Sequence, residues 1–310
     1  MAVYVNTNYS ALQGQRYLSN VQNSLTTTYQ RLSSGMRINS AKDDAAGLQI
    51  ADRLTSQING LNQGNRNASD GIALAQTVES GMDEISGMLQ KIRTLAVQAS
   101  NGTNTAEDKA ALSKEASALA SEINRIAEQT TFGGKQILVG QQENTNTIFS
   151  KATGNDKSKA GTMTLQVGSN KGDTISFQIE NMKFSKITSR ADANFAFGGD
   201  KLANKGAGGA IIFQFSKADP SDAIALMDKM IADVDGQRAN LGAIQNRLES
   251  SIRNQSNVAA NEADARSRIR DADFAEESAN LSQQSIIQQA AASMLMQANT
   301  RPQLGLSLLG

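Results

Sequence analysis

Few side chains in this sequence of 310 residues have the chemistry that catalysis or metal binding needs. There is no His and no Cys, which excludes imidazole bases, Ser-His-Asp triads, thiolate nucleophiles, His- or Cys-based metal sites and disulfides. Carboxylate, Lys-based and Ser-Lys chemistry stay open. With no Trp and only 4% aromatic residues, the chain has little material to line a small-molecule pocket. The composition therefore predicts that the protein is not an enzyme and uses no cofactor.

One short motif, Asp233-Val234-Asp235-Gly236, resembles the start of a calcium-binding loop. The remaining ligand positions of such a loop are missing, so we interpret the motif as helix surface and predict no metal site. The 30 Lys and Arg residues balance 30 Asp and Glu residues, which argues against a nucleic-acid partner. No stretch approaches the ~18 apolar residues of a membrane span, and the N-terminus does not resemble a cleaved signal peptide.

The spacing of apolar residues predicts the helices of this chain. In the N-terminal part, steps of 3 and 4 residues give the a/d pattern of a coiled coil from 18 to 32 and from 51 to 99. Gly35 is expected to end the first helix, and Thr105 to Asp108 to open a third helix as a capping box. The steps of 3 from Ile72 to Val78 form a stammer, which is either a harmless irregularity or a site of register adjustment. The seam residues are Leu18, Val21, Leu25, Leu32, Leu54, Ile58, Leu61, Leu89 and Ile92.

The C-terminal part predicts one very long helix. Asp219 is placed to cap it and Pro220 to occupy its first turn. The 3/4 spacing then continues to residue 269, which at 1.5 Å per residue makes a rod of roughly 70 Å. A charged stretch follows, and then a final amphipathic segment. The apolar residues expected to pack are Leu241, Leu248 and Ile252 on the long helix and Leu281, Ile287, Ala291, Met294, Leu308 and Leu309 in the final segment.

The middle of the chain has a different pattern. Residues 163–167 and 175–179 alternate apolar and polar around a turn, 211–215 is a third candidate strand, and 132–139 is a candidate hairpin. The predicted fold is therefore mainly α: a long helical rod or coiled-coil bundle from both chain ends, with a small central β-rich insertion domain.

Both ends of the chain are predicted to bury their apolar faces against other copies. From Leu281 to Leu309 the sequence has one charged side chain, Arg301, and a monomer rarely leaves so much low-charge surface in water. A head-to-tail contact between copies generates an open helical polymer.

Three blocks of sequence resemble the signatures of bacterial flagellin. They are Leu32 to Leu48 (LSSGMRINSAKDDAAGL), Gln90 to Gln98 (QKIRTLAVQ) and Ser267 to Glu277 (SRIRDADFAEE). The last residues, 297–309, are also similar to the flagellin C-terminus. The resemblance spans most of 1–140 and 219–310, with the blocks in the family's order.

The resemblance implies a subunit that polymerises into the flagellar filament for motility. It implies an inner-tube helix with a spoke in 1–44, rod segments in 45–145 and 219–263, a variable outer β domain in 146–218, and a second spoke with an inner-tube helix in 264–310. It also implies an extracellular location reached by type III export without a cleaved signal peptide, although the missing signal by itself indicates the cytoplasm.

The partners that the resemblance implies are other copies of the chain, an export chaperone on the C-terminal segment, and the filament cap and junction proteins. A host Toll-like receptor is a further candidate partner through Lys91, Leu95, Gln98 and Glu115. The family pattern has Arg at the position of Lys91, and Lys lacks the bidentate guanidinium. The alternatives are a hook-filament junction protein and another helical coiled-coil assembly protein.

Overall fold

The structure is a computed structural model, and it describes residues 7–141, 146–149, 160–193, 195, 198, 202–205, 211–217 and 219–307. The chain forms two compact units. One contains Met1–Asn59 and Val258–Gly310, and the other contains Gly60–Asn257. Two helices, α2 (Ala45–Ala99) and α5 (Pro220–Arg270), each contribute to both units.

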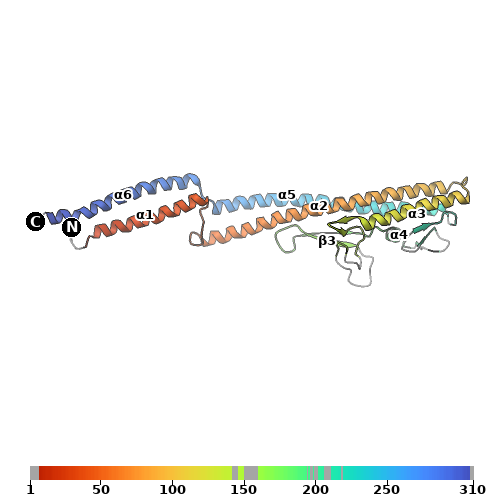
Figure 1. Cartoon of the computed structure of the whole chain (residues 1–310), viewed down its shortest axis with the longest axis horizontal. Helices are drawn as coiled ribbons and strands as arrows, with labels where there is room; N and C mark the ends of the chain where they lie inside the picture. Colours follow the sequence, from red (N-terminus) through yellow and green to blue (C-terminus); the bar gives the residue numbers. More distant parts are fainter. Residues whose placement is uncertain are drawn as a thin grey trace. The chain divides into compact units, whose positions relative to one another are not determined.

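The first unit is built on α1 (Tyr9–Ser34) and α6 (Phe274–Ser307), which lie side by side and antiparallel (Figure 1). Asn8 caps α1, because its side-chain oxygen accepts a hydrogen bond from the backbone N–H of Ala11 at 3.1 Å. Gly35 ends α1 in the left-handed conformation with φ of 69°, as its sequence position predicts. Both boundaries of this helix therefore follow from local chemistry.

The backbone segments that follow α1 and precede α6 are bonded to each other. The N–H of Arg37 donates to the carbonyl of Arg270 at 2.7 Å, and the N–H of Ala272 donates to the carbonyl of Gly35 at 3.0 Å. The second segment is shorter than the sequence suggests, because α5 continues to Arg270 and leaves only 271–273 outside helices. An ion pair between Asp264 and Arg268, one helical turn apart at 2.8 Å, supports helix in this charged stretch.

The second unit contains most of α2 and of α5, which run antiparallel, and all of α3 (Ala106–Gln129). The capping box that opens α3 is confirmed, since Thr105 and Asp108 bond to each other's backbone N–H groups. One hydrophobic core joins the three helices. Its fully buried members include Val78, Met82, Ile85, Leu89, Ile92, Ala116, Ile123, Met227 and Val234.

Polar pairs between α2 and α5 show how the two helices are aligned. Arg93 pairs with Asp228 at 2.5 Å, Arg238 pairs with Asp83 at 3.1 Å, and Asn65 donates to Ser256 at 3.3 Å. Asn65 and Asp83 on α2 are separated by the same number of residues as their partners on α5, Ser256 and Arg238, which follow in the opposite direction. The α2–α5 register within the subunit is therefore the same on both sides of the stammer at 72–78, and a role of the stammer in register adjustment between packed rods stays a prediction.

Between α3 and α5, the residues that the structure describes form three separate antiparallel pairs of strands. They are β1 (Thr131–Phe132) with β2 (Lys135–Gln136), β3 (Gly161–Gln166) with β4 (Thr174–Ile179), and β5 (Ala203–Lys205) with β6 (Ile211–Phe213). The hairpin around 168–173 and the strand after 211 are confirmed. A short helix, α4 (Phe184–Ala191), was not predicted, because its eight residues have no long apolar repeat.

The described part of the insertion packs on the helices and shares their core. Phe184, Phe213 and Phe215 are fully buried in the core that also contains α2, α3 and α5. The hydroxyls of Ser117 and Ser113 on α3 accept hydrogen bonds from the N–H groups of Phe213 and Phe215 at 2.9 and 3.0 Å. A segment this small buries too little area alone, so it uses the helical surface.

Candidate assembly surface

The contact between α1 and α6 is narrow and partly polar. Val21 and Ala291 are its best buried apolar residues, at 9% and 4% exposure. Thr28 donates to the side-chain oxygen of Gln284 at 3.1 Å, and the Nδ2 of Asn8 donates to the carbonyl of Ala298 at 2.8 Å. A two-helix contact of this kind covers one side of each helix and leaves the other sides open.

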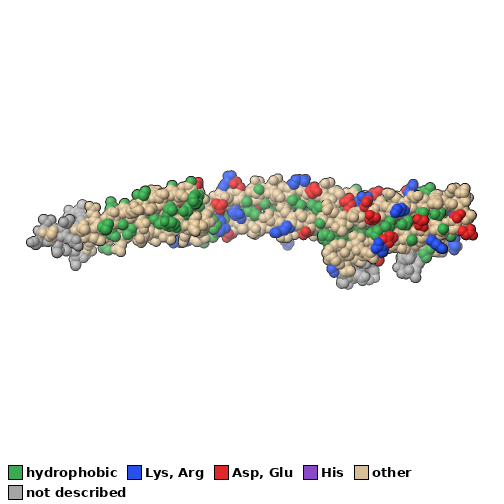
Figure 2. Space-filling model, turned by 45° about the horizontal axis from the view of Figure 1, so that its top comes forward, with side chains coloured by type: hydrophobic (Ala, Val, Ile, Leu, Met, Phe, Trp, Pro, Cys, Tyr) green, Lys and Arg blue, Asp and Glu red, His purple; other side chains and the backbone are tan. Residues whose placement is uncertain are grey.

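Large apolar side chains occupy those open sides. Figure 2 shows apolar side chains on the surface of α1 and α6 with few charged ones among them. The two helices contain only five charged residues. By contrast, both helices carry several large apolar side chains that are exposed by half or more. Their exposed fractions are Tyr9 73%, Leu12 51%, Tyr17 55%, Tyr29 53%, Phe274 68%, Ile286 67%, Met294 70% and Met296 67%.

These exposed residues do not form one stripe. At 3.6 residues per turn, Met294 and Met296 project to opposite flanks of Leu295. Leu295 faces α1, since its Cδ1 lies 3.2 Å from where a Cβ on Gly14 would be. A surface that is apolar in several directions suits contacts with several neighbours and does not suit a simple dimer.

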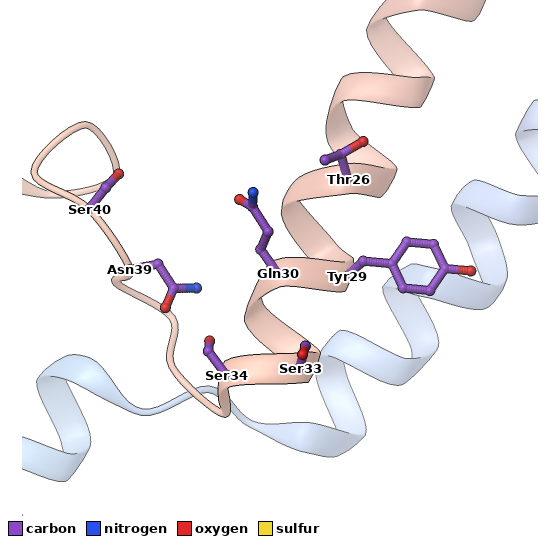
Figure 3. Close-up of a pocket in the computed structure, with 7 residues that line it drawn as sticks. All are labelled: Thr26, Tyr29, Gln30, Ser33, Ser34, Asn39 and Ser40. Atoms are coloured by element: carbon purple, nitrogen blue, oxygen red, sulfur yellow. The ribbon is translucent and has the colours of Figure 1, made fainter.

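A groove lies where α1 meets the segment after it, within the same unit. Its volume is about 670 Å³, and Figure 3 shows Asn39 and Ser40 on the loop opposite Thr26 and Gln30 of α1. Every lining side chain has a hydroxyl or an amide and none has a charge. The residues are Thr26, Tyr29, Gln30, Ser33, Ser34, Asn39 and Ser40. This groove can hydrogen-bond to a polypeptide, but it offers no general base or charged anchor.

Three of the described carboxylates whose pKa is lowered, Asp43, Asp108 and Asp219, lie at helix caps and turns, and a fourth, Glu122, is paired with Arg125 on the surface of α3. Hydrogen bonds from the backbone N–H and the hydroxyl of Thr105 lower the pKa of Asp108. The N–H groups of Ser40 and Asn39 likewise lower the pKa of Asp43. Among the described residues, no group of three or more acidic side chains is placed to hold a metal ion, and no helix is long and apolar enough to cross a membrane.

The residues predicted for the inner tube fall into two groups. Those on the heptad seam of α1, together with three on α6, lie partly or fully buried along the contact: Leu18, Val21, Leu25, Leu32, Leu281, Ile287 and Ala291. Met294 is different, since it points away from α1 and is 70% exposed. Leu308 and Leu309 lie outside the described residues. The assembly role of all ten stays a prediction.

The residues predicted for rod packing lie on inward faces of α2 and α5. Ile58, Leu61, Leu89, Ile92, Leu241 and Leu248 are buried, and Leu54 and Ile252 are partly buried. Leu248 also contacts the β3–β4 hairpin through a small cluster with Ala68 and Val167. The sequence did not predict that contact.

Three of the four candidate receptor residues are exposed. Lys91, Gln98 and Glu115 are open to solvent, whereas Leu95 is partly buried against the main core. Arg93 pairs bidentately with Asp228 of α5, so its guanidinium is already engaged. The receptor role of these four residues stays a prediction.

The exposed residues outside the heptad seam were missed by the sequence interpretation. Tyr9, Leu12, Tyr17, Phe274 and Ile286 break the 3/4 pattern, so periodicity gives no reason to select them. Their signal is the combination of large apolar side chains with almost no charge over two whole helices.

The helices from both chain ends carry apolar surfaces without a partner, and the described residues contain no catalytic constellation. Together these features define a structural protein that assembles with copies of itself. Comparison with known proteins identifies the family. The model of the bacterial flagellin N-terminal helical region matches residues 5–143, and that of the C-terminal helical region matches 224–309. The chain belongs to the bacterial flagellin family and is a structural subunit of the flagellar filament, outside the cell.

Relatives match over the whole length of the chain. Flagellin B of Vibrio cholerae is 36% identical over 376 aligned positions that cover 100% of both chains. Flagellin D of Vibrio anguillarum is 37% identical over 377 positions, again with full coverage of both. In a solved structure assigned to a flagellar hook-associated protein of Vibrio parahaemolyticus, 100% of that chain and 74% of this one align, with a TM-score of 0.52 and 16% identity. At that identity the likeness concerns the fold alone.

Proposed function

We propose that α1 and α6 form the part of the subunit that neighbouring copies cover when the filament grows, in the position of an inner tube. The observation that supports this assignment is the set of eight large apolar side chains exposed around both helices. Full burial of an exposed Leu, Ile, Phe or Met side chain is worth about 1.5–3 kcal/mol, and each of these partly exposed side chains gains a share of that. Contact with several copies removes this surface from water, whereas the isolated chain leaves it exposed.

Low charge favours the same assignment. Repulsion accumulates when many identical charges are stacked along a polymer. In α6 the acidic residues Glu276 and Glu277 lie in the first turn, and Glu277 pairs with Arg31 of α1 at 3.2 Å. The stretch from Leu281 to Thr300 has no charged side chain, so close approach of copies meets little electrostatic opposition.

The test adds one charge to this surface. Filament seeds are incubated with purified Ile286→Glu subunits, and filament length is measured by electron microscopy. The matched control is Ile286→Leu, which keeps the apolar surface. We expect the Leu variant to elongate the seeds and the Glu variant to fail, with equal helix content by circular dichroism. Normal elongation by the Glu variant would show that the assignment is wrong.

A second test removes 281–310. The proposal expects a monomer that no longer polymerises but keeps the core of α2, α3 and α5, seen as cooperative thermal unfolding. Polymerisation of this shortened chain would contradict the role given to α6.

We also propose that the C-terminal segment 281–310, whose one charged side chain is Arg301, is covered by an export chaperone before assembly. The finished subunit then meets the cap and junction proteins at the filament ends. The support is again the exposed apolar surface of α6, which needs a partner at every stage. Pull-down of the chain from flagellated cells with and without 281–310 tests the chaperone contact. Equal recovery of the chaperone with both chains would contradict it.

A further inference from the structure

The methionines of this chain differ sharply in exposure. Those in the main core, such as Met82, Met227 and Met230, are 0–1% exposed. Met36, Met88 and Met163 are partly buried. Among the methionines that the structure describes, only Met294 and Met296 are largely exposed, at 70% and 67%.

These two methionines lie next to the contact between α6 and α1. They lie on either flank of Leu295, the residue through which α6 contacts Gly14 of α1. Their thioethers therefore point away from α1 into two different directions of the assembly surface. The chain contains no Cys, so no thiol competes with them for an oxidant.

We propose that Met294 and Met296 are oxidation sites that control whether a free subunit can join the filament. The proposal rests on the assignment of α6 to the surface that neighbouring copies cover. In the free subunit both sulfurs are open to a peroxide, and in the filament the neighbouring copies shield them.

The reaction uses hydrogen peroxide as the two-electron oxidant. The thioether sulfur attacks one peroxide oxygen, the O–O bond breaks, and an S–O bond forms. The sulfur is oxidised by two electrons, and the peroxide is reduced to water, which retains both hydrogens. Each methionine becomes a sulfoxide, which is polar where the thioether is apolar.

The consequence is a loss of assembly and not of fold. Neither sulfur lies in the contact with α1, so the sulfoxides stay in water while the subunit is free. On assembly their S–O dipoles have to be desolvated against apolar neighbours, which is unfavourable without a hydrogen-bond donor. We expect the rate of seed elongation to fall by about tenfold or more.

The experiment compares three full-length chains: the unchanged sequence, Met294→Leu/Met296→Leu, and the control Met36→Leu. Leu matches the volume of Met and cannot be oxidised. Each is treated with hydrogen peroxide, freed of peroxide, and added to seeds. Elongation is followed by light scattering, and added oxygen is located by peptide mass spectrometry.

The oxidised unchanged chain and oxidised Met36→Leu should elongate seeds about tenfold more slowly or worse, and the oxidised double Leu variant should elongate at its own unoxidised rate. Treatment with methionine sulfoxide reductases and dithiothreitol should restore the unchanged chain. Equal loss in the double Leu variant, or no recovery once the mass has returned, overturns the proposal. This recovery arm decides the matter even if the double variant assembles poorly before oxidation.

Protection in the polymer is the second readout. Met294 and Met296 should gain oxygen at least several-fold more slowly in preformed filaments than in free subunits, and equal rates overturn the proposal. The assignment of α6 fails separately, if unoxidised Ile286→Glu elongates seeds normally. If Ile286→Glu is blocked but the sulfoxides leave elongation unchanged, only the oxidation proposal fails.

Discussion

Arg31 on α1 and Glu277 on α6 form an ion pair across the two terminal helices, with 3.2 Å between Nη1 and Oε1. The carboxylate side chain is only 9% accessible, whereas the guanidinium is 33% accessible. Their contact ties the C-terminal end of α1 to the first turn of α6. A largely buried carboxylate depends on such a partner, because its charge is otherwise poorly solvated.

Arg31→Met should therefore loosen the α1–α6 pair by about 1–2 kcal/mol, since it leaves the Glu277 charge without its partner. The measurement is backbone hydrogen exchange in α1 and α6 of the free subunit. Arg268→Met is the matched control, because its ion pair with Asp264 is highly exposed, and it should change the exchange by less than about 0.5 kcal/mol. Similar exchange in the two variants would contradict this view of the pair.

Gly64 of α2 faces the turn of the β3–β4 hairpin at short distance. A Cβ at this position would lie 2.0 Å from the carbonyl oxygen of Val167. Gly64→Ala should therefore displace the hairpin and lower the free energy of unfolding by about 1–3 kcal/mol, although Ala is the better helix former.

Gly87 in the same helix supplies the control, because nothing lies within 4 Å of a Cβ there. Gly87→Ala should raise stability by about 0.5–1 kcal/mol. Thermal unfolding followed by circular dichroism measures both. If Gly64→Ala were as stable as Gly87→Ala, the hairpin would not depend on this close approach.

Acid should weaken the start of α3. The pKa of Asp108 is held below its ordinary value of 3.8 by hydrogen bonds from the backbone N–H and hydroxyl of Thr105. Because the folded-state pKa is lowered, the stabilisation is complete above the unfolded-state pKa and is lost as the pH falls through the folded-state pKa. The Asp43 and Asp219 carboxylates, lowered by N–H groups of Ser40 and Ser221, act in the same direction.

Asp108→Asn removes this titration, so α3 should lose less stability than in the unchanged chain between neutral pH and pH values below 3.8. Hydrogen exchange of the first turn of α3 across this pH range measures the difference. A steeper pH dependence in the Asn variant would show that the sign is wrong.

Lys91 tests the candidate receptor surface. Its side chain is exposed, but an ammonium makes no bidentate pair with a carboxylate. Lys91→Arg should increase activation of a Toll-like receptor reporter by about three- to tenfold, because a guanidinium can make two parallel hydrogen bonds. Lys42→Arg, an exposed change outside the receptor candidates, should have no effect. An equal response to the two variants would remove Lys91 from the candidate contacts.

Local sequence patterns predicted much of the fold. The end of α1 at Gly35, the capping box of α3 and the start of α5 at Pro220 each depend on neighbouring residues, and all three are found. The division into inner-tube, rod and outer segments is a statement about the polymer, so it stays a prediction. The α4 helix was not predicted because the burial of Phe184, Ile187 and Thr188 depends on residues far away in the sequence.

The family, the helical arms and the near absence of charge at both ends could be predicted without coordinates, because signature blocks, heptad spacing and charge are read directly from the order of residues. The tertiary structure decided which apolar residues α1 and α6 bury and which they leave exposed. Ala291 and Met294 share one apolar pattern, yet Ala291 is buried and Met294 is 70% exposed. The reason is geometric, because α1 covers only one side of α6. The spacing of apolar residues in the sequence does not show how much of the α6 surface that contact covers.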